Sequence, residues 1–308
     1  MHMSASTSQK QRIAVIGLGS MGYGMATSLK RAGHAVTGCD VSADAVARFV
    51  KDGGAGAKTP AEAAKDADIV VSVVVNAAQT ETILFGKDGA AETLPKGSVF
   101  VSSATMDPDV ARRLARQLEA TGRLYLDAPI SGGAQRAAQG ELTILASGSP
   151  AAFAKARPAL DAMAAKLYEL GDAAGQGAAF KMINQLLAGV HIAAASEAIA
   201  FAAKQGLDIR KVYEVITASA GNSWMFENRM PHVLDGDYTP RSAVEIFVKE
   251  DLGIIQDMAR SARFPVPVSA AALQMFLMTS AAGMGRDDDA SVARMYAQVT
   301  GVKLPGDK

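Results

Sequence analysis

The chain has 308 residues, of which 49% are hydrophobic, so it is long enough for two domains that each bury a core. Its 31 basic and 31 acidic residues balance without a basic block, which argues against a nucleic-acid partner. A single cysteine, Cys39, excludes an internal disulfide and fits a cytoplasmic protein. The Ser/Thr-rich start over 1–10 predicts a disordered tail. The most apolar strand-like run, over 69–75, is too short to cross a bilayer, so we expect no membrane partner.

A dinucleotide-binding pattern comes after the tail. An apolar strand-like run over 12–16 leads into a glycine-rich turn made of Gly17, Leu18, Gly19, Ser20, Met21 and Gly22. A helical pattern comes next and stops near Gly33, and a second strand over 34–39 ends in Asp40. The first glycine makes the tight turn, the second lets the backbone approach a pyrophosphate, and the third allows close packing of helix and strand. The alternative is an incidental glycine-rich turn, but strand, helix and acid all fall where the fingerprint requires them.

Asp40 favours NAD over NADP. A carboxylate at the end of the second strand accepts hydrogen bonds from the adenosine ribose and repels a 2′-phosphate. No arginine occurs in the next four residues, Val41-Ser42-Ala43-Asp44. The alternative for Asp40 is an ordinary turn or helix-capping aspartate.

Strands and helices keep alternating up to residue 170, which is typical of a parallel sheet. Val75 and Asn76 end the strand over 69–75, and ligands of open α/β sheets lie at such carboxyl ends. Thr105 precedes a helix over 108–121 and is either its N-cap or a hydroxyl that faces the cofactor. After a strand over 124–127, Ser131, Gly132 and Gly133 form either a nest for a small carboxylate or a tight turn.

The pattern changes after a glycine-rich segment over 171–177, because strand-like runs stop and helices dominate to the C-terminus. We therefore predict an α/β Rossmann-type domain with a doubly wound sheet over 11–174. An all-helical domain over 175–308 would come next and would serve substrate binding and oligomerisation.

A long, largely buried helix over 175–206 opens the second domain. Lys181, Asn184 and Gln185 lie at i, i+3 and i+4, so they share one face of it. An alcohol that loses hydride needs a partner for its proton, and a lysine can take that proton because burial lowers the pKa of an amine. The alternative for Lys181 is a surface lysine whose stem covers apolar groups. No cluster of Cys, His and Asp has metal-ligand spacing, so we expect no metal.

The sequence resembles the β-hydroxyacid dehydrogenase family, the group of 3-hydroxyisobutyrate dehydrogenase and tartronate semialdehyde reductase. The resemblance covers nearly the whole chain after residue 10. It rests on the segments IAVIGLGSMG, SSATMDP, DAPISGG with GELTILASG, GQGAAFKMINQ, DLG and GRDDDAS. It implies a Rossmann domain followed by a helical domain, a small hydroxy-acid substrate and a homodimer or homotetramer. It places Lys181 on the family's catalytic lysine, Ser131 to Gly133 on its substrate-carboxylate loop and Thr105 on its cofactor-contacting threonine.

Two positions depart from the family pattern. The second of two asparagines after the lysine is Gln185, so that amide arm is longer. The later Lys-Asp-Leu motif here reads Lys249-Glu250-Asp251-Leu252, in a helix predicted over 242–263. Either Glu250 replaces the lysine, or Lys249 is that lysine with one residue added after it, which in a regular helix rotates the later residues by about 100°. The resemblance implies that the lysine at this point holds substrate or cofactor. The alternative is that Lys249, Glu250 and Asp251 form a solvated face of the helix.

Finer segments resemble one branch of the family, the NAD-linked branch that oxidises the C2 hydroxyl of L-threonate. They are GNSWMFENRMPH, AVEIFVK and RFPVPVSAAALQMF. Other members imply 3-hydroxyisobutyrate oxidation or reduction of tartronate or succinic semialdehyde as alternatives. A catalytically silent cofactor-binding module is a further alternative, and the presence of Lys181 argues against it.

Overall fold

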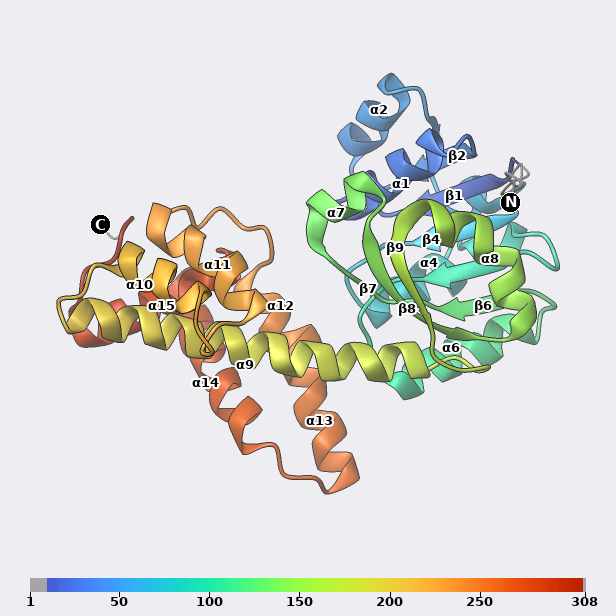
Figure 1. Cartoon of the computed structure of the whole chain (residues 1–308). Helices are drawn as coiled ribbons and strands as arrows, with labels where there is room; N and C mark the ends of the chain where they lie inside the picture. Colours follow the sequence, from blue (N-terminus) through green and yellow to red (C-terminus); the bar gives the residue numbers. More distant parts are fainter. Residues whose placement is uncertain (1–9, 307–308) are drawn as a thin grey trace, which may run out of the picture. The chain divides into compact units, whose positions relative to one another are not determined.

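The computed structural model describes residues 10–306, so all of the predicted tail except Lys10 lies outside the described residues. Two compact units make up the chain, one ending at Lys181 and the other beginning at Met182. The first is built on a sheet and the second on helices (Figure 1). The predicted fold class, a Rossmann-type domain followed by an all-helical one, is confirmed.

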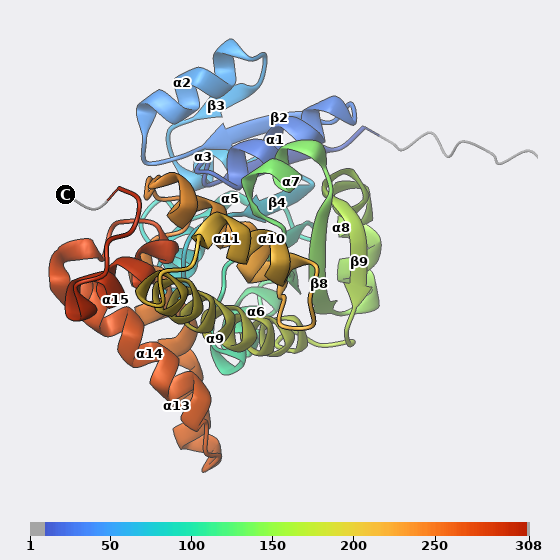
Figure 2. The ribbon, with the colours of Figure 1, turned by 60° about the vertical axis from the view of Figure 1, so that its left-hand side comes forward.

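The sheet has the strand order β3-β2-β1-β4-β5-β6-β8-β7, with β9 beside β8. The first six strands pair in parallel in the order 3-2-1-4-5-6 of a dinucleotide-binding fold, and β6 and β8 are antiparallel. Figure 2 shows β2 and β3 at one edge of the sheet, with the helix over 43–51 beside them. The strands are β1 (Arg12–Ile16), β2 (Ala35–Cys39), β3 (Ala55–Ala57), β4 (Ile69–Ser72), β5 (Val99–Ser102), β6 (Leu124–Asp127), β7 (Ile130–Ser131), β8 (Leu142–Gly148) and β9 (Ala164–Glu169).

Helices cover both faces of this sheet. Ile13 and Val15 point into one apolar core, and Ala14 and Ile16 point into the other, because side chains alternate along a strand. The first core is closed by α1 (Gly22–Arg31), α2 (Ala43–Lys51), α7 (Gly133–Gln139) and α8 (Pro150–Met163). The second is closed by α3 (Pro60–Ala64), α4 (Ala77–Phe85), α5 (Ala90–Thr93) and α6 (Pro108–Glu119).

The second unit consists of helices around two further apolar cores. The long helix α9 (Gln176–Lys204) begins in the first unit and continues into this one. Among the described helices, it alone is long and apolar enough to cross a membrane, but half of its most apolar window is buried, as in a core helix. The others are α10 (Ile209–Thr217), α11 (Trp224–Asp235), α12 (Val244–Ile246), α13 (Leu252–Ala262), α14 (Pro267–Thr279) and α15 (Val292–Thr300). The π turns η1 (Phe247–Asp251) and η2 (Ser280–Met284) and the 3₁₀ turn η3 (Asp289–Ser291) join them.

Several elements differ from the sequence predictions. The strand predicted over 69–75 ends at Ser72, so Val75 and Asn76 belong to the loop after it. The short elements β3, α4, α5, β7 and α7 were not predicted, and neither was α11, which contains Pro231. The helix predicted over 242–263 is interrupted by the π turn η1.

Two of the three aspartates before the last helix, Asp288 and Asp289, are buried and paired. Asp288 accepts hydrogen bonds from the backbone N–H groups of Arg241 and Ala290 and lies 2.8 Å from His232 Nδ1. Asp289 pairs with Arg229 at 2.7 Å. These two carboxylates tie α11 to the segment before α15.

Candidate active site

The glycine-rich turn has the shape that the fingerprint predicts. Gly17 has φ +96°, and a Cβ there would overlap the carbonyl of Val73. Gly22 begins α1, and a Cβ there would overlap the carbonyl of Gly17. A Cβ on Gly19 would meet nothing within 4 Å. Gly17 and Gly22 therefore close the turn, and Gly19 leaves open space in front of the backbone, as the approach of a pyrophosphate requires.

Asp40 lies next to this turn. Its Oδ2 accepts a hydrogen bond from Leu18 N at 2.6 Å, and its Oδ1 accepts one from Ser42 N at 2.8 Å. Ser42, and not Asp40, caps α2, so the helix-capping alternative for Asp40 is wrong. The hydrogen bonds from Leu18 N and Ser42 N do make Asp40 a turn aspartate. Each carboxylate oxygen can accept a further hydrogen bond, so these contacts leave capacity for ribose hydroxyls.

Asn76 and Thr105 come after neighbouring parallel strands of the sheet. Asn76 caps α4, with Oδ1 accepting from Gln79 N at 3.0 Å, and Val75 beside it is 50% exposed. Asp107 caps α6, so the alternative that Thr105 is the N-cap is wrong. Thr105 is half-buried in the loop between β5 and α6. The side that faces the cofactor in this fold is the carboxyl edge, to which these loops belong.

Lys181 lies beside the predicted carboxylate nest. Its side chain is only 8% exposed, and Nζ donates a hydrogen bond to Ile130 O at 2.9 Å. The surface-lysine alternative is therefore wrong. Ile130 directly precedes Ser131, and Gly132 and Gly133 come next with φ of +137° and +78°. The first unit thus brings a buried amine and a run of small residues with accessible backbone to one place.

Sequence reasoning missed the residues that hold the start of α9. Asp127 Oδ2 accepts hydrogen bonds from Gly175 N at 2.9 Å, Ala178 N at 2.8 Å and Ser147 Oγ at 3.2 Å. Ser147 Oγ in turn accepts from Gly177 N at 2.9 Å. Burial raises the pKa of Asp127 to about 6, although these donors pull it down. The sequence did hold a signal for Asp127, because a carboxylate at the end of an otherwise apolar buried strand requires hydrogen-bond partners.

Asn184 and Gln185 come after Lys181 on α9 and are hydrogen-bonded to each other. Asn184 Nδ2 donates to Gln185 Oε1 at 2.9 Å, and Gln185 Nε2 donates to Asp251 Oδ2 at 2.8 Å. Asp251 is 1% exposed, so the solvated-face alternative is wrong for this residue. Lys249 is 65% exposed and pairs with Glu245 at 2.5 Å, and that hydrogen bond raises the pKa of Lys249.

The π turn η1 lies where the sequence departs from the family's Lys-Asp-Leu pattern. It contains Lys249, Glu250 and Asp251. A π turn closes over five residues where an α turn closes over four, so it absorbs one extra residue. If one residue is added after Lys249, the rotation by about 100° is therefore taken up within the turn. This favours the interpretation that Lys249 is the family lysine with one residue added after it.

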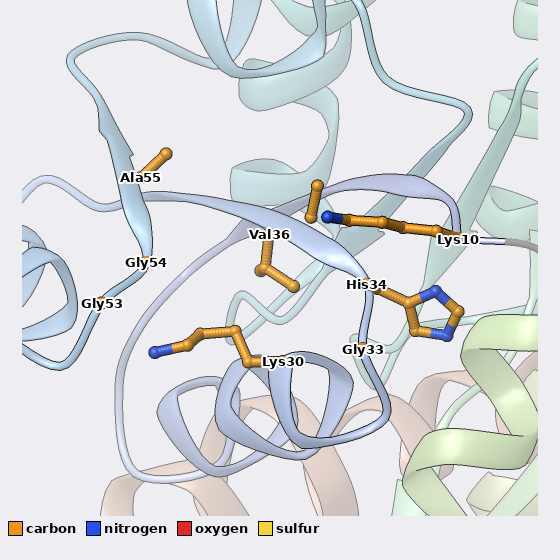
Figure 3. A pocket seen from close by; sticks show the side chains of 9 residues that line it. Lys10, Lys30, Gly33, His34, Val36, Gly53, Gly54 and Ala55 are labelled. Atoms are coloured by element: carbon orange, nitrogen blue, oxygen red, sulfur yellow. The ribbon is translucent and has the colours of Figure 1, made fainter.

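A pocket of about 500 Å³ lies at the amino ends of the parallel strands, opposite to the loops at their carboxyl ends (Figure 3). It is lined by residues at the starts of β2 and β3, where parallel strands do not bind ligands. Lys30 is held there by the carbonyl of Asp52 and the ring of Phe49, and His34 Nδ1 accepts from Gln11 N. These groups therefore serve the fold. Within residues 10–306, no three His, Cys, Asp or Glu side chains gather as a metal site.

Two family models match the chain. The NAD binding domain of 6-phosphogluconate dehydrogenase matches residues 12–171, and the NAD-binding model of NADP-dependent 3-hydroxyisobutyrate dehydrogenase matches residues 175–296. The chain is 53% identical to L-threonate dehydrogenase of Cupriavidus necator over 96% of its length and 98% of the relative's. It is 48% identical to L-threonate dehydrogenase of Pectobacterium atrosepticum, with 96% of each chain covered.

A solved structure shares this architecture over most of the chain. The crystal structure of 3-hydroxyisobutyrate dehydrogenase from Salmonella typhimurium is 49% identical, with a TM-score of 0.88, and the match covers 92% of this chain and 99% of that one. The glycine-rich turn, the sheet order and these full-length similarities agree with one another. The chain therefore belongs to the β-hydroxyacid dehydrogenase family, the family of 3-hydroxyisobutyrate dehydrogenase, and is an NAD-dependent hydroxyacid dehydrogenase.

Proposed function

We propose that this enzyme oxidises L-threonate at C2 to the 2-oxo acid, with Lys181 as the general base. The observation that carries the proposal is the position of the buried Lys181 amine, 2.9 Å from Ile130 O and next to Ser131. The two L-threonate dehydrogenases at 53% and 48% identity support this substrate. The resemblance of the segments around Trp224 and Pro265 to the same branch supports it as well.

The carboxylate of the substrate would bind at Ser131, Gly132 and Gly133, where the hydroxyl and the backbone N–H groups donate hydrogen bonds. Asn184, and with it Gln185, would orient the remaining hydroxyls. A neutral Lys181 amine donates one N–H to Ile130 O and takes the proton of the C2 hydroxyl while the C2–O bond becomes a carbonyl. Lys181 then returns that proton to solvent, and in the reverse direction it acts as the acid.

NAD supplies the hydride acceptor when it is bound. The turn from Gly17 to Gly22 would hold its pyrophosphate and Asp40 its adenosine ribose. The backbone and side chains of Val75, Asn76 and Thr105 would line its path along the carboxyl edge. Lys249 would contact substrate or cofactor only after leaving Glu245, with which it pairs in this structure.

We further propose a cytoplasmic homodimer or homotetramer. Ile183, Leu187 and Phe201 on α9 are 62%, 49% and 64% exposed, and a run of exposed apolar groups on one helix favours a subunit contact. Light scattering of the purified protein measures the oligomer, and a monomer at micromolar concentration would contradict it.

A panel of three- and four-carbon hydroxy acids, read by NADH absorbance, tests the substrate. We expect the highest kcat/KM for L-threonate. The solved Salmonella typhimurium protein, 49% identical to this chain, is named 3-hydroxyisobutyrate dehydrogenase, so 3-hydroxyisobutyrate is the second candidate substrate. A higher kcat/KM for 3-hydroxyisobutyrate would overturn L-threonate as the substrate. No NADH from any acid in the panel would overturn hydroxy-acid oxidation itself as the proposed activity.

A further inference from the structure

Three polar side chains of the second unit form one hydrogen-bond relay, which we define as Asp251, Gln185 and Asn184. Asp251 lies in the π turn η1 and is 1% exposed. Its Oδ2 accepts from Gln185 Nε2 at 2.8 Å, and Gln185 Oε1 accepts from Asn184 Nδ2 at 2.9 Å. Asn184 itself is exposed. The relay therefore connects a buried carboxylate to an amide at the surface of α9.

The relay has a fixed direction. An ionised carboxylate only accepts hydrogen bonds, so Gln185 must turn its NH₂ group toward Asp251. This choice leaves Gln185 Oε1 facing Asn184, and Asn184 must then turn its NH₂ group toward Gln185. The orientation of the Asn184 amide is consequently set by a carboxylate two side chains away, and Asn184 Oδ1 is directed away from Gln185.

Both departures from the family pattern meet in this relay. Gln185 has one methylene more than asparagine, and Asp251 is the last residue of the π turn η1, which lies at the departure from the Lys-Asp-Leu pattern. The longer arm and the wider turn act on the same hydrogen bond. A shortened arm would not span the same distance from the α9 backbone to Asp251 Oδ2.

We propose that Asp251 and Gln185 are positioning residues that make Asn184 present its amide oxygen to a substrate hydroxyl beyond the reacting carbon. The proposal rests on the proposed function, in which Asn184 meets the substrate. A hydroxyl donates to Asn184 Oδ1, whereas an alkyl group leaves that oxygen unpaired, so the relay selects polyhydroxylated acids over alkyl ones. It sets specificity and does not take part in proton transfer.

The test compares L-threonate with 2-hydroxybutanoate, which keeps the carboxylate, the C2 hydroxyl and the chain length but lacks the two distal hydroxyls. Gln185→Asn shortens the arm, and Asp251→Asn removes the group that dictates the direction. Gln205→Asn, just after α9, and Asp257→Asn, an exposed position on α13, are the matched controls. We expect the kcat/KM for L-threonate divided by that for 2-hydroxybutanoate to fall roughly three- to tenfold in both relay variants. This is the usual contribution of one neutral hydrogen bond.

The fall should come from KM for L-threonate, while kcat/KM for 2-hydroxybutanoate stays within about twofold of wild type. The double variant should lose no more selectivity than the worse single variant, because the two residues act in series. If Asp251→Asn fails to fold in a thermal melt, Gln185→Asn at its half-buried site still decides the question.

The outcomes separate the two proposals. A wild type that oxidises L-threonate, with relay variants that keep its selectivity, would overturn the relay alone. Equal loss on both acids would also overturn it, because it would show a general structural role. A wild type that produces no NADH from L-threonate would overturn the proposed function, and the relay proposal with it.

Discussion

The carboxylate of Asp40 accepts two backbone hydrogen bonds, so its negative charge is held in place at the end of β2. One of these bonds reaches Leu18 in the glycine-rich turn. The residue that would contact the ribose is thus also part of the support for the pyrophosphate turn. Val41 beside it is fully exposed and offers no positive charge for a 2′-phosphate.

Asp40→Asn should weaken the preference for NAD over NADP. The amide keeps the size of the side chain and removes the charge that repels a 2′-phosphate. We expect the NADP-to-NAD ratio of kcat/KM to rise about tenfold or more, since the lost repulsion between two close charges exceeds about 1.4 kcal/mol. Asp44→Asn, exposed in the first turn of α2, is the control. A ratio equal to that of wild type would remove Asp40 as the selector.

The start of α9 depends on a buried acid rather than on a capping residue of its own. Asp127 and Ser147 accept the backbone N–H groups of Gly175, Gly177 and Ala178, which an isolated helix would leave without partners. Because Ile130 and the nest lie on the same strand-to-helix segment as Asp127, this cap fixes Lys181 relative to Ser131.

Asp127 should give the enzyme a recognisable pH dependence of stability. Its pKa is about 6 in the folded chain against an ordinary 3.8, so between these values the folded state holds a proton that the unfolded state has lost. The stability that this group contributes is therefore fully present below pH 3.8 and is lost as the pH rises to about 6. The total loss is on the order of 3 kcal/mol, and the contribution does not change further at higher pH.

Asp127→Asn removes this titration. Urea unfolding of both proteins at several pH values should show the wild type losing stability relative to the variant as pH rises from about 4 to about 6.5. Asp289, whose pKa burial also raises to about 6, is present in both proteins and cancels. A difference in unfolding free energy that stays constant with pH would contradict this assignment.

The π turn η1 makes a prediction about a deletion. Removal of Glu250 should close the π turn to an α turn and leave the register of α13 unchanged, so Leu252 and Ile255 stay buried. Removal of Asp257 from regular helix rotates the remainder of α13 by about 100°. We expect the first deletion to shift Tm by a few degrees and the second by much more, as measured by circular dichroism. Equal loss in both would mean that the π turn holds no spare residue.

For the molecule as a whole, the sequence predicted those features that depend on local chemistry. The turn from Gly17 to Gly22, the strand at 124–127 and the long helix that carries Lys181 all derive from patterns within one or two elements. The fold class and the family derive from the order of such patterns. The domain boundary at 174 stays a prediction, as do the roles of the site residues.

The features that the sequence could not predict depend on distant partners. Asp127 meets Ala178 across 51 positions, and Gln185 meets Asp251 across 66, so no local pattern reports either contact. Thr105 and Asp107 are both good capping residues two positions apart, and only the geometry decided for Asp107. The short strand β3 is made of alanine and glycine, which carry no strand signal.

The central claim is that the buried Lys181 amine moves the proton during hydroxy-acid oxidation. Its most direct test is the kcat of Lys181→Ala with saturating L-threonate and NAD, alongside the NAD dissociation constant. We expect kcat to fall roughly 10²- to 10⁴-fold, the usual worth of a general base, with NAD affinity within about twofold of wild type. Lys204→Ala, at the exposed end of the same helix, should keep both values. Turnover of Lys181→Ala near the wild-type rate would contradict the account.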